Sequence, residues 1–394
     1  MEALPLYTPE VLPGYDLTPA TSISPSTRPS SPVSSLTREY ARYNYSYRSE
    51  RMELDLGTRK WGTKLPAYGR AAQIQGTLTV HSFKHVDRIV VRLIGKLNTS
   101  HVMNQIPTFS QSHTIIHKPH ELWSSEAASS SGPRENVFPF MFSLDRDDDG
   151  SESLPPSATI QLSRAQVHIA YAIRVDMYRR GIHMHETLQT EILYLPRTTS
   201  QYCRPFIPES GNEKRPRISD YEWHTLALLS EPTKRLKPKP EIDCERAPAL
   251  LLPRDLSYPS GQSIPFIISA PSLVDKDEVQ VQLVRVSTVQ TRAGVVQQVN
   301  IVSRGRIHPT SEPTSTTIRG TLDTGVAGKE ASWNFGSLAR ISYQVRAQVR
   351  SLWKVVQEVD VTSHEWRGQV ASELPALGSS VVSRTAIHLM NMSV

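Results

Sequence analysis

Two alternating segments on either side of residue 84 limit what this chain can fold into. Apolar or small residues take every second position, first at Ile74, Gly76, Leu78 and Val80 and then at Ile89, Val91, Leu93 and Gly95. A period of two puts successive side chains on opposite faces of a sheet, so both segments are predicted to be half-buried strands. Gly76 in mid-strand predicts a bend or a close backbone approach. The stretch 65–97 is therefore predicted to form two strands of a sheet that packs on another sheet.

The same alternation recurs through the first half of the chain, without a convincing helix. Further strands are predicted within 52–56, 113–123, 136–144, 168–179 and 185–196. Pro139 marks its strand as an edge or a bulge, because proline cannot donate to a ladder. Segment 168–179 places five residues on one face, namely Ile169, Tyr171, Ile173, Val175 and Met177. Many short strands separated by loops predict a β-sandwich over residues 51–197.

A second strand-rich block follows and predicts a second sandwich over residues 244–368. Its strands are predicted within 247–272 (two strands around a Ser-Gly turn), 278–292, 295–307, 316–325, 339–351 and 355–366. Residues 198–243 form a predicted linker, because the charge-rich stretch 231–241 contains prolines that prevent a helix from continuing. Segment 221–231 fits either a short helix or a strand.

Both ends of the chain are predicted to be tails. Residues 1–50 include the Ser- and Pro-rich stretch 22–35, which has no apolar face to bury and is predicted to be disordered. Residues 369–394 are predicted to be a weakly ordered C-terminal tail. The hydrophobic share of 38% is below the usual value, which agrees with part of the chain remaining unfolded.

Composition narrows the class of protein. The net charge of +6 and the pI near 9.2 permit contact with anionic membranes or acidic partners and do not require nucleic acid. Two cysteines in 394 residues give no disulfide framework and favour a reducing cytosol. There is no secretory signal at the N-terminus and no apolar run long enough for a membrane helix. We therefore expect a cytoplasmic protein.

No pattern of catalytic or metal-binding residues is present. The sequence has no GxSxG, no HExxH and no glycine-rich phosphate loop, so no catalytic residue and no cofactor is predicted. His183, His185 and Glu186 lie close together, but a closed metal site usually needs four ligands. The acidic stretch 145–150 lacks the twelve-position pattern of a calcium loop. His113, His117 and His120 are predicted to be surface residues.

The order of these landmarks resembles the arrestin fold. The stretch PAYGRAAQIQGTLTV (66–80) with its following strand is similar to the first β-hairpin of arrestins. Residues 154–181 and 185–197 resemble later strands of the arrestin N-domain, so the resemblance covers about 52–197. The second block is similar to an arrestin C-domain only through residues such as Ile341, Tyr343 and Val345. The resemblance implies an all-β fold of two tandem immunoglobulin-like sandwiches with a disordered N-terminal tail.

The tail and the linker are similar to those of α-arrestins, which link membrane cargo to ubiquitin ligases. Members of that group dock WW domains of HECT ligases through PPxY or LPxY motifs, and this chain has no PPxY. It carries LPLY and LPGY, whose WW-binding candidates are Leu4, Pro5, Tyr7, Leu12, Pro13 and Tyr15. A proline in an extended segment with a nearby tyrosine is what a WW groove recognises. The resemblance thus implies a non-enzymatic adaptor that promotes ubiquitination and endocytosis of transporters or receptors.

Two further motifs have weaker functional interpretations. A third LPxY copy, at 65–68, matches the pattern of the fold itself and is predicted to be structural. The basic cluster in the linker is a candidate for contact with a membrane surface through Lys234, Arg235, Lys237 and Lys239. Because of this basic cluster and the resemblance to α-arrestins, we expect the protein to be peripheral to the plasma membrane or endosomes.

Two other functions stay open at this stage. An arrestin-fold sorting or coat scaffold, similar to the retromer subunit, would use the sheets and need no ligase motif. An enzyme or lectin on tandem sandwiches would need polar residues converging in one pocket, for example around His183, His185 and Glu186. The expected partners are therefore a WW-domain HECT ligase, cytosolic tails of membrane proteins and anionic membrane, with no nucleic acid.

Overall fold

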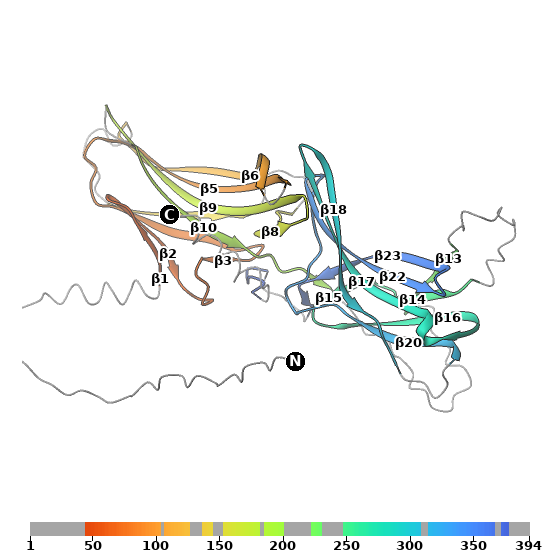
Figure 1. Ribbon diagram of the computed structural model, residues 1–394. Coiled ribbons are helices and arrows are strands. Elements are labelled where there is room, and N and C mark those ends of the chain that lie inside the picture. The colour runs from red at the N-terminus through yellow and green to blue at the C-terminus, as the bar shows by residue number, and fades with distance from the viewer. Residues whose placement is uncertain are drawn as a thin grey trace, which may run out of the picture. The chain divides into compact units, whose positions relative to one another are not determined.

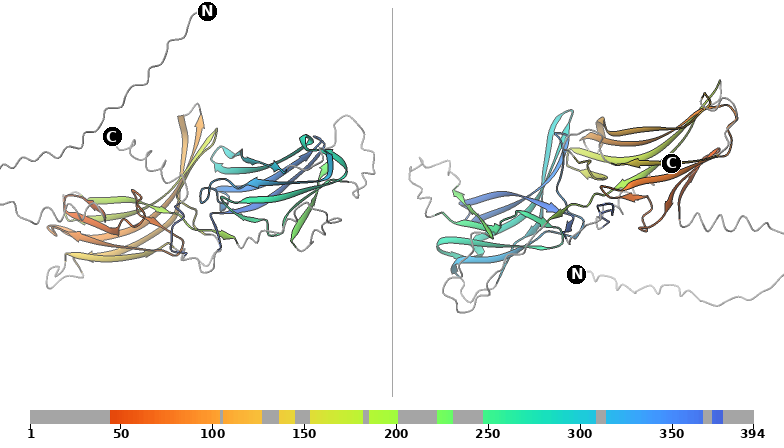
Figure 2. Two further views of the ribbon diagram at one scale, coloured as in Figure 1. Left: turned by 90° about the horizontal axis from the view of Figure 1, so that it is seen from below. Right: turned by 180° about the vertical axis from the view of Figure 1, so that it is seen from behind.

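The structure is a computed structural model, and it confirms an all-β chain (Figures 1 and 2). It describes residues 44–103, 106–126, 136–144, 153–181, 185–200, 222–230, 247–308, 314–366 and 372–377. Within these ranges the regular elements are strands, apart from one 3-10 turn, η2 (Lys276–Glu278). No helix within these ranges has the length and apolar character needed to cross a membrane.

One sheet of the first sandwich has the strand order β1-β2-β4-β7, with antiparallel neighbours. Its strands are β1 (Asn44–Arg48), β2 (Met52–Thr58), β4 (Gln73–Val80) and β7 (Val137–Ser143). β7 lies at the edge of the sheet, as Pro139 predicted. β1 falls inside the stretch 1–50 that the sequence assigned to the tail, because its NYSYR sequence has no alternating apolar pattern.

The second sheet has the order β3-β10-β9-β5-β6, and β8 also pairs with β9. Its strands are β3 (Ala67–Tyr68), β5 (Val86–Met103), β6 (Ile106–Ser124), β8 (Ala158–Gln161), β9 (Ala165–Arg179) and β10 (Glu186–Tyr194). β9 is central, and it pairs antiparallel with β5 over almost its whole length. The five residues predicted to share one face of 168–179 are all buried.

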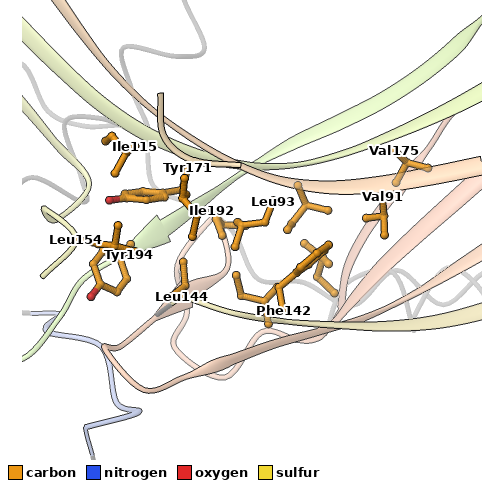
Figure 3. Packing of buried hydrophobic residues seen from close by; sticks show 14 of the residues in the cluster. Val91, Leu93, Ile115, Phe142, Leu144, Leu154, Tyr171, Val175, Ile192 and Tyr194 are labelled. Atoms are coloured by element: carbon orange, nitrogen blue, oxygen red, sulfur yellow. The ribbon is translucent and has the colours of Figure 1, made fainter. Parts of the chain in front are cut away.

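Alternating apolar side chains from both sheets fill the core between them (Figure 3). The rings of Tyr171 and Tyr194 lie edge to face with centroids 5.4 Å apart, and the Tyr171 hydroxyl donates to the Pro155 carbonyl at 2.7 Å. Gly76 is the close approach that the sequence predicted. A Cβ placed on it would lie 2.4 Å from Cζ of Phe140, so no larger residue fits without movement.

The second sandwich also has two main sheets, with orders β12-β14-β16-β20-β19 and β13-β23-β22-β17-β18. The first contains β12 (Trp223–Ala227), β14 (Ala249–Pro253), β16 (Ser263–Asp275), β19 (Arg306–Ile307) and β20 (Thr314–Asp323). The second contains β13 (Leu229–Ser230), β17 (Val279–Thr291), β18 (Gly294–Arg304), β22 (Ala339–Val349) and β23 (Trp353–Thr362). β15 (Ser257–Pro259) pairs with β23, β21 (Trp333–Phe335) with β22, and β11 (Thr199–Ser200) with β24 (His364–Glu365).

In the second sandwich the structure settles one ambiguity and corrects the predicted number of strands. Within segment 221–231, residues 223–227 and 229–230 form strands β12 and β13 and not a helix, so this part of the predicted linker 198–243 belongs to the second sandwich. The prediction of two strands in 247–272 is wrong, because three strands occupy it. Leu256 takes a left-handed backbone conformation with φ of 48°, which ends β14 and lets β15 begin. A left-handed leucine is uncommon, so the sequence does not signal this break.

A short C-terminal segment, residues 372–377, packs on the first sandwich beside β3 and β10. The Gly69 amide donates to the Glu373 carbonyl at 3.1 Å, and the Ala376 amide donates to the Leu195 carbonyl at 2.9 Å. A Cβ on Gly69 would lie 2.5 Å from the carbonyl oxygen of Leu374, so the contact requires glycine there. Nothing in the sequence of the predicted tail indicated this contact.

Candidate functional site

Charged residues take the outward positions on two neighbouring strands of the first sandwich. On β9 the alternation that buries Val175 and Met177 turns Arg174, Asp176 and Tyr178 away from the core. On β5 the same alternation places Arg92 on that outer face. In the antiparallel register Arg92 lies directly opposite Arg174. Like charges in directly opposite positions are destabilising, so this pair requires a compensating anion.

Asp176 supplies the compensating charge, although its side chain is only 1% exposed. Both arginines donate to its carboxylate, Arg92 through Nη1 and Arg174 through Nε at 2.9 and 3.1 Å. The Thr187 hydroxyl on β10 donates to the same group at 2.8 Å. A buried carboxylate is tolerated only when paired and hydrogen-bonded, and Asp176 meets both conditions.

Tyr178 and His185 complete the cluster. The Tyr178 hydroxyl accepts from Nη2 of Arg92 at 2.7 Å, and the guanidinium of Arg88 lies 4.7 Å from its ring centroid. The His185 ring lies against Tyr178 at a tilt of 42°, with centroids 4.5 Å apart, and its Nε2 is 3.1 Å from Oδ1 of Asp176. Burial, followed by the charges of Arg174 and Arg92, lowers the pKa of His185. A neutral His185 therefore donates to Asp176 without adding charge to the cluster.

Beside this cluster the sheet surface forms an open hollow of about 490 Å³, here called the basic hollow. It is lined by Arg92, Ile94, Lys96, Thr114, His117, Arg174, Asp176 and Tyr178. Three cationic side chains face one carboxylate, so the lining has a net positive charge. The Arg174 side chain is 39% exposed, and only its Nε bonds to a described residue. Its terminal N–H groups can therefore bind a carboxylate or a phosphate.

The site residues predicted from the sequence lie outside the residues that the structure describes. This holds for the WW-binding candidates Leu4, Pro5, Tyr7, Leu12, Pro13 and Tyr15, and for the membrane candidates Lys234, Arg235, Lys237 and Lys239. The acidic stretch 145–150 lies outside them as well. These assignments stay predictions.

The histidine patterns do not converge on a metal site among the described residues, and His183 lies outside those residues. His185 contacts Asp176, whereas the neighbouring Glu186 accepts from the backbone amide of Arg51 at 3.1 Å. Among the described residues no group of three or more potential ligands is arranged for a metal. His117 and His120 are exposed, as predicted, and His113 is half-buried. The LPxY copy at 65–68 is structural, because its last two residues form β3 and pair with β10.

Sequence reasoning missed the basic hollow, although a signal was present. Arg92 and Lys96 are spaced four apart in one alternating strand, and Arg174 and Asp176 two apart in another. Such spacing puts each pair on one face. The missing information was that β5 and β9, which are about eighty residues apart in the chain, are neighbours in this register.

Comparison with known proteins finds similar solved structures but no matching protein family. No protein-family model matches this chain, and no curated protein matches it. Among solved structures it is similar to the crystal structure of squid arrestin, with 11% sequence identity and a TM-score of 0.43. That match covers 83% of this chain and 100% of the squid protein. The assignment as tandem all-β sandwiches follows from the sheets themselves and not from this likeness.

Proposed function

We propose that this chain is a non-enzymatic, arrestin-like adaptor that links membrane cargo to a WW-domain HECT ubiquitin ligase. In this proposal the first sandwich holds a cytosolic segment of a transporter or receptor, and the tail motifs recruit the ligase. Ubiquitination of the cargo then leads to endocytosis. The observation that carries the cargo-binding part is the basic hollow, and the ligase part is supported by the two LPxY motifs.

The chemistry of the basic hollow favours an anionic segment. Arg92 and Arg174 are held in place by Asp176, so little side-chain entropy is lost when Arg174 binds a second anion. Exposed Lys96 adds charge without contributing to the cluster around Asp176. An extended segment rich in aspartate, glutamate or phosphoserine fits this lining better than a neutral one, because charge complementarity discriminates between partners.

Binding of short fluorescent peptides tests the cargo part. We expect a glutamate-rich peptide to bind, its glutamine counterpart to bind more weakly, and added salt to reduce the difference. Lys96→Glu should weaken binding about three- to tenfold, in keeping with loss of one favourable charge contact. Lys84→Glu is the matched control, since Lys84 is also exposed on this sandwich but does not line the hollow. Equal weakening by both variants would contradict a specific site.

Capture on isolated WW domains tests the ligase part. The full chain should bind, and a Tyr7→Ala/Tyr15→Ala variant should not, because each tyrosine anchors its motif. Two motifs eight residues apart gain by effective concentration against a ligase with several WW domains. If the chain binds acidic peptides but no WW domain, the arrestin-fold coat scaffold becomes the better interpretation. If neither ligand binds, both parts of the proposal fail.

Membrane contact is a further part of the proposed role. Leu229 in β13 is 74% exposed and lies just before the linker that holds the basic cluster 234–239. An exposed apolar residue followed closely in the chain by several cations is a combination that binds anionic lipid surfaces. Flotation with phosphatidylserine vesicles should retain the chain, and replacing the four cations with glutamine should release it. Equal retention on neutral vesicles would argue against this role.

A further inference from the structure

Strand β18 differs from the other strands at sheet edges. It is the outer arm of the β17–β18 hairpin and the last strand of its sheet (Figure 1). It is 11 residues long. Residues 294–303 within it contain no charged residue and no proline. An edge of this kind presents unpaired N–H and C=O groups to any chain that can pair with them.

Proteins normally protect such edges with charges, prolines or short strands. The other long edges in the described part of this chain follow that rule. β6 carries Lys118, Pro119 and Glu121, and β7 has Pro139 in its centre. The edge strands β1 and β12 have only 5 residues each. The absence of protection on β18 is therefore specific to this strand.

One face of β18 is also apolar and exposed. Val295, Val299 and Ile301 are 65%, 43% and 51% exposed, and the alternation places all three on the same side. The opposite face is half-buried, and there the Gln298 side chain accepts from the Ser163 amide at 3.0 Å. β18 is thus half-buried on one face and exposed on the other.

We propose that β18 pairs antiparallel with β18 of a second copy of this chain, about a two-fold axis at Gln298. In this register Val295 lies opposite Ile301 of the other copy, and Gln297 lies opposite Val299. The apolar side chains of both copies then form one continuous cluster across the axis. A two-fold pairing occupies the free edge of β18 in both copies, so it gives a closed dimer and not a fibre.

The composition of the strand favours an identical partner. A charged edge would repel its own copy, whereas 294–303 is neutral at every position. Its polar residues near the axis, Gln297, Gln298 and Asn300, are amides. An amide is both donor and acceptor, so it can pair with another amide, including its own counterpart. This inference does not depend on the proposed adaptor function.

Sedimentation of the full chain over a range of concentrations tests the proposal. We expect a reversible monomer–dimer equilibrium with a dissociation constant in the micromolar range, because an edge pairing buries little surface. Val299→Lys should weaken the dimer at least about tenfold, since it brings two like charges close to the axis. Val356→Lys is the matched control. Val356 is 57% exposed on β23 of the same sheet, two strands away from β17, and should leave the dimer intact.

Oxidative cross-linking tests the register. Gln298→Cys should form a covalent dimer readily, because this position meets itself at the axis. Gln297→Cys should form one more slowly, since it faces Val299 of the other copy. The wild-type chain, with Cys203 and Cys244, sets the background. A monomer at every concentration, an undiminished dimer in Val299→Lys, growth into polymers, or equal cross-linking at 297 and 298 would each overturn the proposal.

Discussion

Replacing Asp176 with asparagine tests the account of the basic hollow most directly. The substitution keeps the size of the side chain and removes its charge. Arg92 and Arg174 then face each other across neighbouring strands without a counter-charge. The asparagine amide can accept through one oxygen only, and its N–H₂ group would point at a guanidinium donor. We therefore expect Asp176→Asn to destabilise the first sandwich.

The size of this loss of stability depends on how exposed the two arginines that pair with Asp176 are. Breaking a fully buried ion pair by removing one partner costs about 3–5 kcal/mol. Here the side chains of Arg92 and Arg174 are 18% and 39% exposed, so water can solvate part of the released charge. We accordingly expect a loss of about 2–3 kcal/mol. For a domain of this size that corresponds to a fall in Tm of roughly 5–10 °C.

Thermal unfolding followed by calorimetry and near-UV circular dichroism measures this loss. Glu358→Gln is the matched control, because its pair with Arg340 is exposed, with side chains 53% and 49% accessible. Exposed pairs contribute little, so the control should shift Tm by less than about 2 °C. If Asp176→Asn lowers Tm no more than this control does, then Asp176 does not compensate the two arginines.

Three further outcomes are expected from other parts of the chain. Gly69→Val should release the C-terminal segment, because its side chain would overlap the Leu374 carbonyl. Amide exchange of residues 372–377 should then become faster, and unchanged protection of these amides would contradict the prediction. Gly76→Val should lower the free energy of unfolding by about 1–3 kcal/mol, because its side chain overfills the space beside Phe140. An unchanged midpoint of urea unfolding would contradict this packing. Burial lowers the pKa of His168, so the unfolded chain binds its proton more readily and stability should fall as pH drops below 6.5. His168→Gln should reduce that fall between pH 7 and 5, and an identical pH profile would argue against a role for this residue.

The strands were predictable from sequence because each depends on a local pattern. Alternation over 73–80 and 168–179 reflects one buried face, and the structure confirms it in β4 and β9. Segment 221–231 was ambiguous, because a short apolar run fits a helix or a strand equally well. Only its pairing with β14 selects the strand.

The basic hollow could not be predicted in the same way. It depends on the register between β5 and β9, which places Arg92 opposite Arg174, and no local pattern encodes that register. The turn at Leu256 was missed for a related reason. Its left-handed backbone is imposed by the strands around it and not by a glycine. Contacts between distant segments therefore account for most of what the sequence did not reveal.

The hydrogen bond from Gly69 to Glu373 has a consequence for synthesis of the protein. The two residues are separated by most of the chain, so this rim of the first sandwich stays uncovered while the second is being made. Leu195 and Glu373 are 178 residues apart (373 − 195), so at ribosomal rates of about 5–20 residues per second that interval lasts roughly 9–36 s. During this interval Leu193 and Leu195 lack their contact with Ala376, and a chain truncated at residue 368 would never form it. Chains truncated at residue 368 should therefore aggregate more readily than the full-length chain, even though they retain the described strands of both sandwiches.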